Sequence, residues 1–225
     1  MQDLFIILGA FSLGIIHVVT GIDHLAAMAP SSITSTKLAI KNGFSWGLGH
    51  SLGLILLTIL TFLIKDLAKV DTFSNFSEFF VGISLLIVGF FAIKNSFQLS
   101  IHSHSHKHKN GVAHQHVHFH NKKQKTHNKH SHALTGLGLL QGIAGGSHFI
   151  TISPVLVLPT TQAIAYLFSY LIGSLISMII FSYLVSYSLL ISGQKYIKKL
   201  ILFVGGLSFS IGIFLVQKTI PLLLN

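Results

Sequence analysis

Hydrophobic residues fill six long stretches of this chain, and polar residues gather between them. The stretches cover residues 4–28, 44–64, 78–97, 134–158, 163–191 and 198–222. Each has about 20 residues or more, the length that an α-helix needs to cross the hydrocarbon core of a bilayer. With 51% hydrophobic and 9% charged residues, the chain differs from soluble globular domains. The pattern predicts an all-α integral membrane protein with six transmembrane helices.

The first three stretches recur in the second half of the chain. Positions of the first stretch match positions of the fourth at an offset of 124: Leu13, Gly14, Gly21, His24 and Pro30 with Leu137, Gly138, Gly145, His148 and Pro154. Positions of the third match the sixth at an offset of 123: Phe80, Val81, Gly82, Gly89 and Phe91 with Phe203, Val204, Gly205, Gly212 and Phe214. An odd number of spans per copy turns the second copy upside down. We therefore predict a 3+3 inverted repeat of residues 1–97 and 134–225, joined by a loop at 98–133.

The charge of the chain is concentrated in lysines between the stretches. Its net charge of +10 comes from 15 basic residues, all lysines, against five acidic ones. Only Lys65, Lys69 and Lys218 fall on one side of the predicted membrane, and the others fall on the opposite side with the central loop. The positive-inside rule then predicts a multi-pass plasma-membrane protein with both termini outside and a cytoplasmic loop. Without a basic leader, the first stretch is expected to remain as a span rather than to act as a signal peptide.

Four histidines and one acid fall within or at the ends of the predicted spans: His17, Asp23, His24, His50 and His148. Ionisable groups in a membrane cost several kcal/mol unless they face a partner or a wet cavity, so each marks a candidate functional site. The alternative for a single histidine is a hydrogen bond across a helix interface. Asp23 is the only acid we expect inside a span, and a buried carboxylate needs a cation or a proton.

Spacing predicts that the first helix is interrupted. His17 and His24 would lie about 10 Å apart along the axis of a continuous helix, too far to share one ion. We therefore expect the backbone to unwind around Gly21, as transporter helices do beside ion sites. Gly145 and Gly146 predict the same break in the fourth span, just before His148.

Two further glycines concern packing rather than chemistry. Gly49 and Gly53, four residues apart, permit a close helix crossing that would bring His50 against the first span.

The candidate site residues point to a metal ion. The chain has no cysteine, which excludes disulfides and thiolate ligands. Imidazole nitrogens with one carboxylate suit borderline divalent ions such as Ni²⁺, Co²⁺ or Zn²⁺. We predict His17, Asp23, His24, His50 and His148 as ligands. In the second copy Gln141 stands in place of His17 and Ser147 in place of Asp23, so the acid lies on one side only.

The central loop holds the other eleven histidines: His102, His104, His106, His108, His114, His116, His118, His120, His127, His130 and His132. Many alternate with other residues, which places them on one side of an extended chain. The segment has no apolar periodicity and is expected to be disordered without metal. Metal buffering or sensing, a pH-responsive linker and a neutral spacer are the three interpretations.

Three segments carry a resemblance to a known family. They are His17-Val-Val-Thr-Gly-Ile-Asp23-His24-Leu-Ala-Ala, Gly43-Phe-Ser-Trp-Gly-Leu-Gly-His50-Ser-Leu-Gly and Gly138-Leu-Leu-Gln-Gly-Ile-Ala-Gly-Gly-Ser-His148. They resemble the nickel/cobalt transporter superfamily, particularly its urease-accessory (UreH-like) branch. The resemblance implies six spans, transport of Ni²⁺ or Co²⁺, and an essential His–Asp–His motif at His17, Asp23 and His24. The chain departs from strict nickel/cobalt permeases in having five residues, rather than four, between the first histidine and Asp23.

These observations lead to a non-enzymatic transporter as the main hypothesis. We expect a secondary permease that takes up Ni²⁺ or Co²⁺ for urease or hydrogenase maturation, with no permanently bound cofactor and no nucleic-acid partner. The lipid bilayer and the metal ion are its expected partners, and a metallochaperone or a second copy of the chain are candidates. Efflux of the same ions is one alternative, and a membrane haem protein with two histidine ligands is another.

Overall fold

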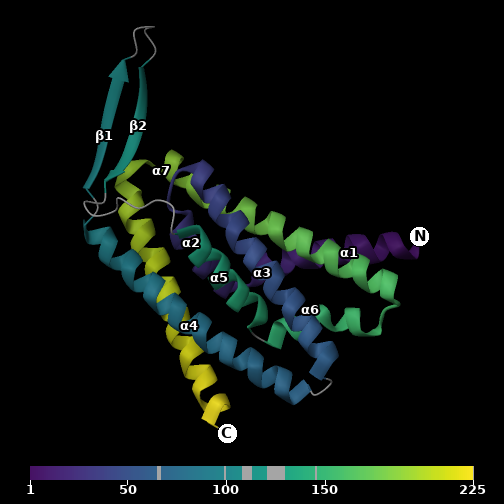
Figure 1. Ribbon diagram of the computed structural model, residues 1–225. Coiled ribbons are helices and arrows are strands. Elements are labelled where there is room, and N and C mark those ends of the chain that lie inside the picture. Colours follow the sequence, from purple (N-terminus) through teal and green to yellow (C-terminus); the bar gives the residue numbers. More distant parts are fainter. Residues whose placement is uncertain (65–66, 99, 108–112, 121–129, 145, 225) are drawn as a thin grey trace.

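The computed structural model describes residues 1–225 except 65–66, 99, 108–112, 121–129, 145 and 225 (Figure 1). Helices form most of that part of the chain, and two strands form the rest of its regular structure. In chain order the elements are α1 (Gln2–Thr20), α2 (Ile22–Ser32), α3 (Thr36–Ile64), α4 (Leu67–Gln98), β1 (Ser100–Lys107), β2 (Ala113–His120), α5 (His130–Ile143), α6 (Gly146–Val157) and α7 (Thr160–Leu224). The helical bundle agrees with the predicted all-α class.

Five helical segments within the described residues are long and apolar enough to cross a membrane. They are Gln2–Thr20, Thr36–Leu63, Asn75–Lys94, Thr160–Ser188 and Lys198–Leu222. The last two are the arms of α7, which Figure 1 shows in green and yellow, running in different directions from a bend. The stretch predicted as an interrupted fourth span forms two helices, α5 and α6, of 14 and 12 residues, and α5 ends at Ile143 just before the predicted break. Neither reaches membrane length, so the described residues contain five helical segments of that length and not the six predicted spans.

The outer faces of these helices are apolar. Exposed side chains include Phe44, Phe62, Phe80, Phe90 and Phe168, each about half accessible. Contiguous exposed apolar surface is rare on soluble proteins and is typical of membrane-facing surfaces. The N and C marks in Figure 1 lie away from the end of the bundle that carries the two strands.

The first predicted span breaks at Gly21, as the spacing indicates. Gly21 has φ −74° and ψ 92°, an extended conformation between α1 and α2. Its N–H still donates to the carbonyl of His17, at 3.0 Å, which closes α1. The new helix contains Pro30, which has no N–H to donate to the carbonyl of Ala26. Ser208 Oγ lies 2.6 Å from that carbonyl and donates to it, so a side chain of α7 replaces the missing helical bond.

Glycines allow the helices to approach to backbone contact. A methyl group on Gly14 would overlap the carbonyl of Tyr170, and one on Gly138 would overlap the carbonyl of Trp46. The next neighbours are the backbone nitrogens of Ser174, at 2.9 Å, and of His50, at 3.0 Å. Small residues at crossings are the usual means by which membrane helices pack closely. The α1–α7 and α3–α5 crossings are therefore built alike.

Helix α4 packs against the second arm of α7 in the same manner. A methyl group on Gly82 would lie 2.9 Å from a side-chain carbon of Val216, and one on Gly212 would lie 2.8 Å from the carbonyl of Gly82. Farther along the crossing, a methyl group on Gly89 would lie 2.7 Å from the carbonyl of Gly205. These contacts hold α4 against the second arm of α7.

The histidine-rich segment contains β1 and β2, which pair antiparallel and extend from one end of the bundle (Figure 1). The register places three histidines opposite three others: His102 with His118, His104 with His116, and His106 with His114. We expected this segment to lack order, and the structure shows a hairpin over these residues. Alternation of histidine with Ser, Val and Phe has the period of two that a strand requires.

A second acid lies inside a predicted span, contrary to expectation. Glu78 is 6% exposed and lies in the membrane-length segment of α4. Lys218 Nζ lies 2.7 Å from Glu78 Oε1, so the buried carboxylate has a cationic partner on the second arm of α7. The sequence analysis missed this pair because the two residues are 140 positions apart.

The close crossing between α3 and α5 gives a first testable prediction. Gly138→Ala should lower the free energy of unfolding by about 1–3 kcal/mol, because the new methyl group meets backbone that cannot move aside cheaply. Thermal unfolding in detergent would measure the change. Gly136→Ala is the matched control on the same helix, since a methyl group there would meet nothing within 4 Å. Equal stability of the two variants would contradict the packing argument.

Candidate metal centre

Four histidines from four different helices meet in the interior of the bundle. His17 lies on α1, His24 on α2, His50 on α3 and His148 on α6. Each offers one ring nitrogen, and these nitrogens all lie within 4.8 Å of one another. His24, His50 and His148 are each no more than 1% exposed. All four were predicted ligands, and the fold brings them together.

The break at Gly21 brings the first two histidines into contact. His17 and His24 are seven positions apart, yet their Nε2 atoms lie 2.9 Å from each other. In a straight helix they would lie about 10 Å apart along the axis. At 2.9 Å one of the two nitrogens carries a hydrogen and the other accepts it. An unbroken first helix would separate these groups.

His50 is buried without a hydrogen-bond partner. Within the described residues neither of its ring nitrogens has one, although the side chain is 0% exposed. Its ring centroid lies 4.9 Å from that of His24 and 5.3 Å from that of His148. A buried polar group with no partner costs about 1–3 kcal/mol. A bound cation would satisfy this side chain, which is the strongest local indication of a ligand.

His148 belongs to the same cluster, which the sequence alone did not establish. Its Nδ1 is bonded to the carbonyl of Ala144, four residues earlier. Its ring centroid lies 4.8 Å from that of His17. Because Nδ1 bonds to the backbone, Nε2 is the nitrogen left to serve as a ligand atom.

Asp23 lies beside the cluster rather than within it. Its Oδ2 lies 2.9 Å from His24 Nδ1, the nitrogen that faces away from His17. Its side chain is 36% exposed, in contrast to the buried imidazole that it contacts. A carboxylate behind a ligating histidine is a common arrangement in metal sites, where it fixes the tautomer and the ring orientation. The predicted role of Asp23 as a direct ligand is not what this geometry favours.

Two residues that the sequence analysis did not select complete the polar network. Gln141 is 1% exposed, accepts a hydrogen bond from Trp46 Nε1 at 2.7 Å, and has its Nε2 3.4 Å from Asp23 Oδ2. The sequence places Gln141 only at the position equivalent to His17. An isolated Gln and the single Trp of the chain carry no spacing signal that would have revealed this bond.

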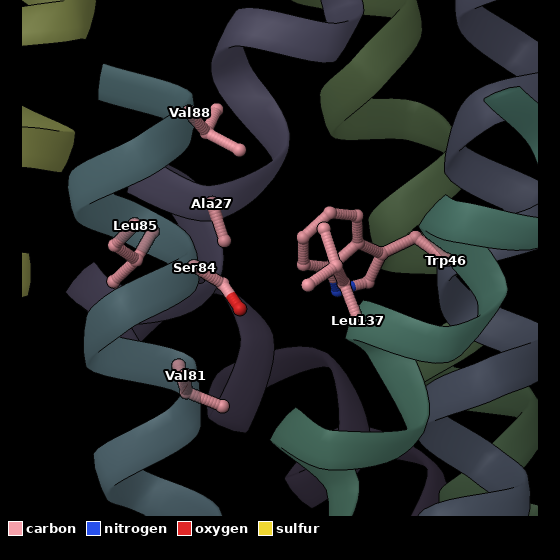
Figure 2. Close-up of a pocket in the computed structure, with 7 residues that line it drawn as sticks. All are labelled: Ala27, Trp46, Val81, Ser84, Leu85, Val88 and Leu137. Carbon is pink, nitrogen blue, oxygen red and sulfur yellow. The ribbon is translucent and has the colours of Figure 1, made fainter. Parts of the chain in front are cut away.

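An apolar pocket lies beside Trp46. Figure 2 shows Trp46 and Leu137 facing Val81, Leu85 and Val88 across it. Ala27 and Ser84 also line this pocket, and none of the four clustered histidines does. The pocket is therefore separate from the histidine cluster, and its lining gives no ligand chemistry of its own.

Other predicted functional residues lie elsewhere. Seven loop histidines fall on β1 and β2, and His130 and His132 begin α5. His108, His127 and Gly145 lie outside the described residues. Gly49 and Gly53 form a close crossing, but with α5 and not with the first span as predicted, and Gly146 is the first residue of α6.

The donor set suits an imidazole-binding transition metal. Zn²⁺ takes four ligands in a tetrahedron with Zn–N distances of about 2.0–2.1 Å, which separates the nitrogens by about 3.4 Å. The four nitrogens lie within 4.8 Å, so small rotations of the rings would bring them to that spacing. Imidazole ligands also suit copper and iron.

The fold and this site define the class of the molecule. It is a helical chain with membrane-length apolar segments whose interior encloses a cluster of four histidines.

Comparison with known proteins finds two plant relatives. The chain is 28% identical over 170 residues to Chloroplast protein FOR GROWTH AND FERTILITY 1 of Arabidopsis thaliana, covering 75% of this chain and 46% of that protein. It is 34% identical over 90 residues to Chloroplast protein FOR GROWTH AND FERTILITY 2 of the same plant, covering 40% of this chain and 24% of that protein. The chain thus spans less than half the length of these relatives. No family model and no solved structure matches it.

These comparisons correct the predicted family and function. The relatives are chloroplast growth and fertility proteins, and no match supports the nickel/cobalt transporter superfamily or its urease-accessory branch. Nickel or cobalt transport, in either direction, was therefore the wrong prediction. The short His–Asp–His signature reflects a broken helix with buried imidazoles, a local geometry that does not by itself identify a family.

His50 gives a second prediction: the effect of its substitution on the free energy of unfolding should change sign when metal is present. In a chelator, His50→Leu should raise the free energy of unfolding by about 1–3 kcal/mol, because it removes a buried polar group without a partner. With Zn²⁺ present the order should reverse, because only the wild type retains all four ligands. Thermal unfolding of both proteins in detergent, with EDTA and with Zn²⁺, tests this. A variant that is less stable than the wild type in both conditions would indicate a packing role for His50.

Proposed function

We propose that this chain is a membrane protein that binds one transition-metal ion, with Zn²⁺ as the best fit, in the cluster of His17, His24, His50 and His148. The observation that carries the proposal is the convergence of four buried ring nitrogens within 4.8 Å of one another. Buried polar groups are normally hydrogen-bonded, so an interior site that concentrates imidazoles and leaves His50 unpartnered calls for a cation.

The proposed centre has a stabilising role rather than a catalytic one. Four protein ligands fill a tetrahedral coordination sphere and leave no open position for a substrate, which distinguishes structural from catalytic zinc sites. The ligands come from α1, α2, α3 and α6, so one ion would join both interrupted helices to α3. In this proposal the metal ion stays bound to the protein, in contrast to the transported ion that the sequence led us to expect.

We also propose the 3+3 inverted repeat for the helical part of the chain. Gly14 meets Tyr170 and Ser174, and Gly138 meets Trp46 and His50. Each residue of the first contact is 124 positions from its equivalent in the second, so the same contact occurs twice with the roles of the two halves exchanged. His24 and His148 are each the third residue of a helix that follows a break. A reversed second copy accounts for both observations, because a pseudo-two-fold axis exchanges the partners of each crossing.

The repeat implies an orientation in the membrane. With three crossings per half, both termini lie on one side and the hairpin of β1 and β2 on the other. Lysines favour the side of the hairpin, which is then cytoplasmic. We propose the cell membrane as the location of this chain, while its plant relatives are chloroplast proteins by name.

A direct binding measurement tests the metal centre. Metal content and Zn²⁺ titration of the purified protein in detergent should show one ion fewer per chain in His50→Leu and in His148→Leu than in the wild type. The remaining three nitrogens should bind at least about 100-fold more weakly, in line with the loss of a first-sphere ligand. His132→Leu, an exposed histidine at the start of α5, is the control and should keep the ion. Full Zn²⁺ content in the cluster variants would refute the proposal.

The hairpin is proposed as a second place where metal binds. Its register sets His104 opposite His116, with one further histidine pair on each side, all at even-numbered positions. Histidine pairs thus recur at every second position and form a row along the two strands. Such a row supports a metal-buffering role for this segment.

Exchanging neighbouring residues tests the register without changing composition. The double variant Ser103→His with His104→Ser moves one histidine to the opposite face of β1. If the row binds metal, this variant should lose at least one weakly bound Zn²⁺ relative to the wild type in equilibrium dialysis, while the ion of the buried cluster remains. If the stoichiometry and affinity of Zn²⁺ binding were unchanged, the positions of the histidines along β1 would not matter for binding.

A further inference from the structure

We propose that Gln141 is a positioning residue of the metal centre, which it serves by holding Asp23 against His24. The inference rests on the proposed metal-binding function and names a residue from the second half of the chain. Its basis is a chain of hydrogen bonds that runs from the buried Trp46 and Gln141 through the partly exposed Asp23 to the ring of His24.

The orientation of the Gln141 amide follows from its neighbours. The indole N–H of Trp46 can only donate, so the atom 2.7 Å from it must be the amide oxygen. The amide nitrogen then lies on the other side, 3.4 Å from Asp23 Oδ2, an acceptor. Donor and acceptor therefore match at both ends of a side chain that is 1% exposed. With the amide reversed, its nitrogen would face the N–H of Trp46, which is also a donor, and its oxygen would face Asp23 Oδ2, which is also an acceptor.

Asp23 connects Gln141 to His24, the proposed metal ligand. Its Oδ2 receives the amide of Gln141 and also lies 2.9 Å from His24 Nδ1. A carboxylate there holds the hydrogen on Nδ1, which leaves the lone pair of His24 on Nε2. That nitrogen is the one 2.9 Å from His17 Nε2, inside the cluster. Gln141 thus acts on the ligand through two hydrogen bonds without touching the ion.

The position of Gln141 in the repeat explains why it has this role. It lies 124 positions after His17, at the equivalent place in the second half. The first half supplies three of the four histidines, and the second half supplies His148 alone. Ser147 stands where Asp23 stands in the first half, so the second half supplies no carboxylate at the position equivalent to Asp23. The amide instead serves the carboxylate of the first half.

Two substitutions separate positioning from packing. Gln141→Met keeps the length and burial of the side chain but removes both polar contacts, and Gln141→Glu keeps an acceptor for Trp46 while removing the donor to Asp23. We expect each to weaken Zn²⁺ binding about 10–100-fold, the usual effect of losing an outer-sphere partner. The matched control is Gln162→Met, because Gln162 Nε2 also donates to an aspartate, Asp3, at 2.9 Å but far from the cluster.

Coupling to Asp23 gives the decisive readout. Asp23→Asn should weaken binding to a similar extent, and the double variant Asp23→Asn with Gln141→Met should be no weaker than the worse single variant. If the losses of Zn²⁺ affinity in the two single variants multiplied in the double variant, Gln141 would act independently of Asp23, and the proposal would be overturned. The electron paramagnetic resonance spectrum of bound Cu²⁺ should change in the Gln141 variants and stay unchanged in Gln162→Met.

The outcomes distinguish this inference from the proposed function. If Gln141 only fills space, its variants lower thermal stability while Zn²⁺ affinity and the Cu²⁺ spectrum match those of the wild type, and the inference fails. If the cluster does not bind metal, the wild type and His50→Leu take up the same amount of Zn²⁺, and the proposed function fails first. Binding that is lost in His50→Leu and unaffected in both Gln141 variants would leave the function standing without the positioning role.

Discussion

The break in the first helix at Gly21 is the constraint on which the centre depends. It turns a separation of seven residues into a contact of 2.9 Å between His17 and His24. A helix in a membrane keeps its backbone hydrogen bonds within itself, so a break survives only where other groups replace them. Here the Gly21 N–H still donates to the carbonyl of His17, and the hydroxyl of Ser208 donates to the carbonyl of Ala26, which Pro30 leaves without its helical donor.

Close helix crossings supply the remaining two histidines. Because Gly138 allows α5 to reach the backbone of α3 at Trp46, His50 is held in the interior beside the broken helix. The short helix α6 then carries His148 into the same space. The α3–α5 approach depends on a residue without a side chain, because a methyl group on Gly138 would overlap the carbonyl of Trp46. Packing and chemistry are therefore coupled in this bundle.

Some buried polar side chains have hydrogen-bond or ion-pair partners and others do not, and this contrast locates the site. Glu78 has Lys218, and Gln141 has both Trp46 and Asp23. His50 stands out among these buried groups, because neither of its nitrogens has a hydrogen-bond partner within the described residues. His50 is thus the imidazole with both ring nitrogens unpartnered among the described residues, at the point where three other imidazoles meet. That contrast favours a cation over simple packing.

Hydropathy and spacing determined the helical class, the membrane-length apolar segments, the break at Gly21 and the four histidines that converge, because these follow from local periodicity and from the cost of burying charge. The short motif did not determine the family, since no family model matches the chain and its two relatives are chloroplast proteins by name. Only the tertiary structure decided that His148 joins His24, that Asp23 lies behind the cluster, and that Gln141 holds it. The contacts of His148 with His24 and of Gln141 with Asp23 join residues more than 100 positions apart, and their geometry is set by the crossing of helices, which no local pattern encodes.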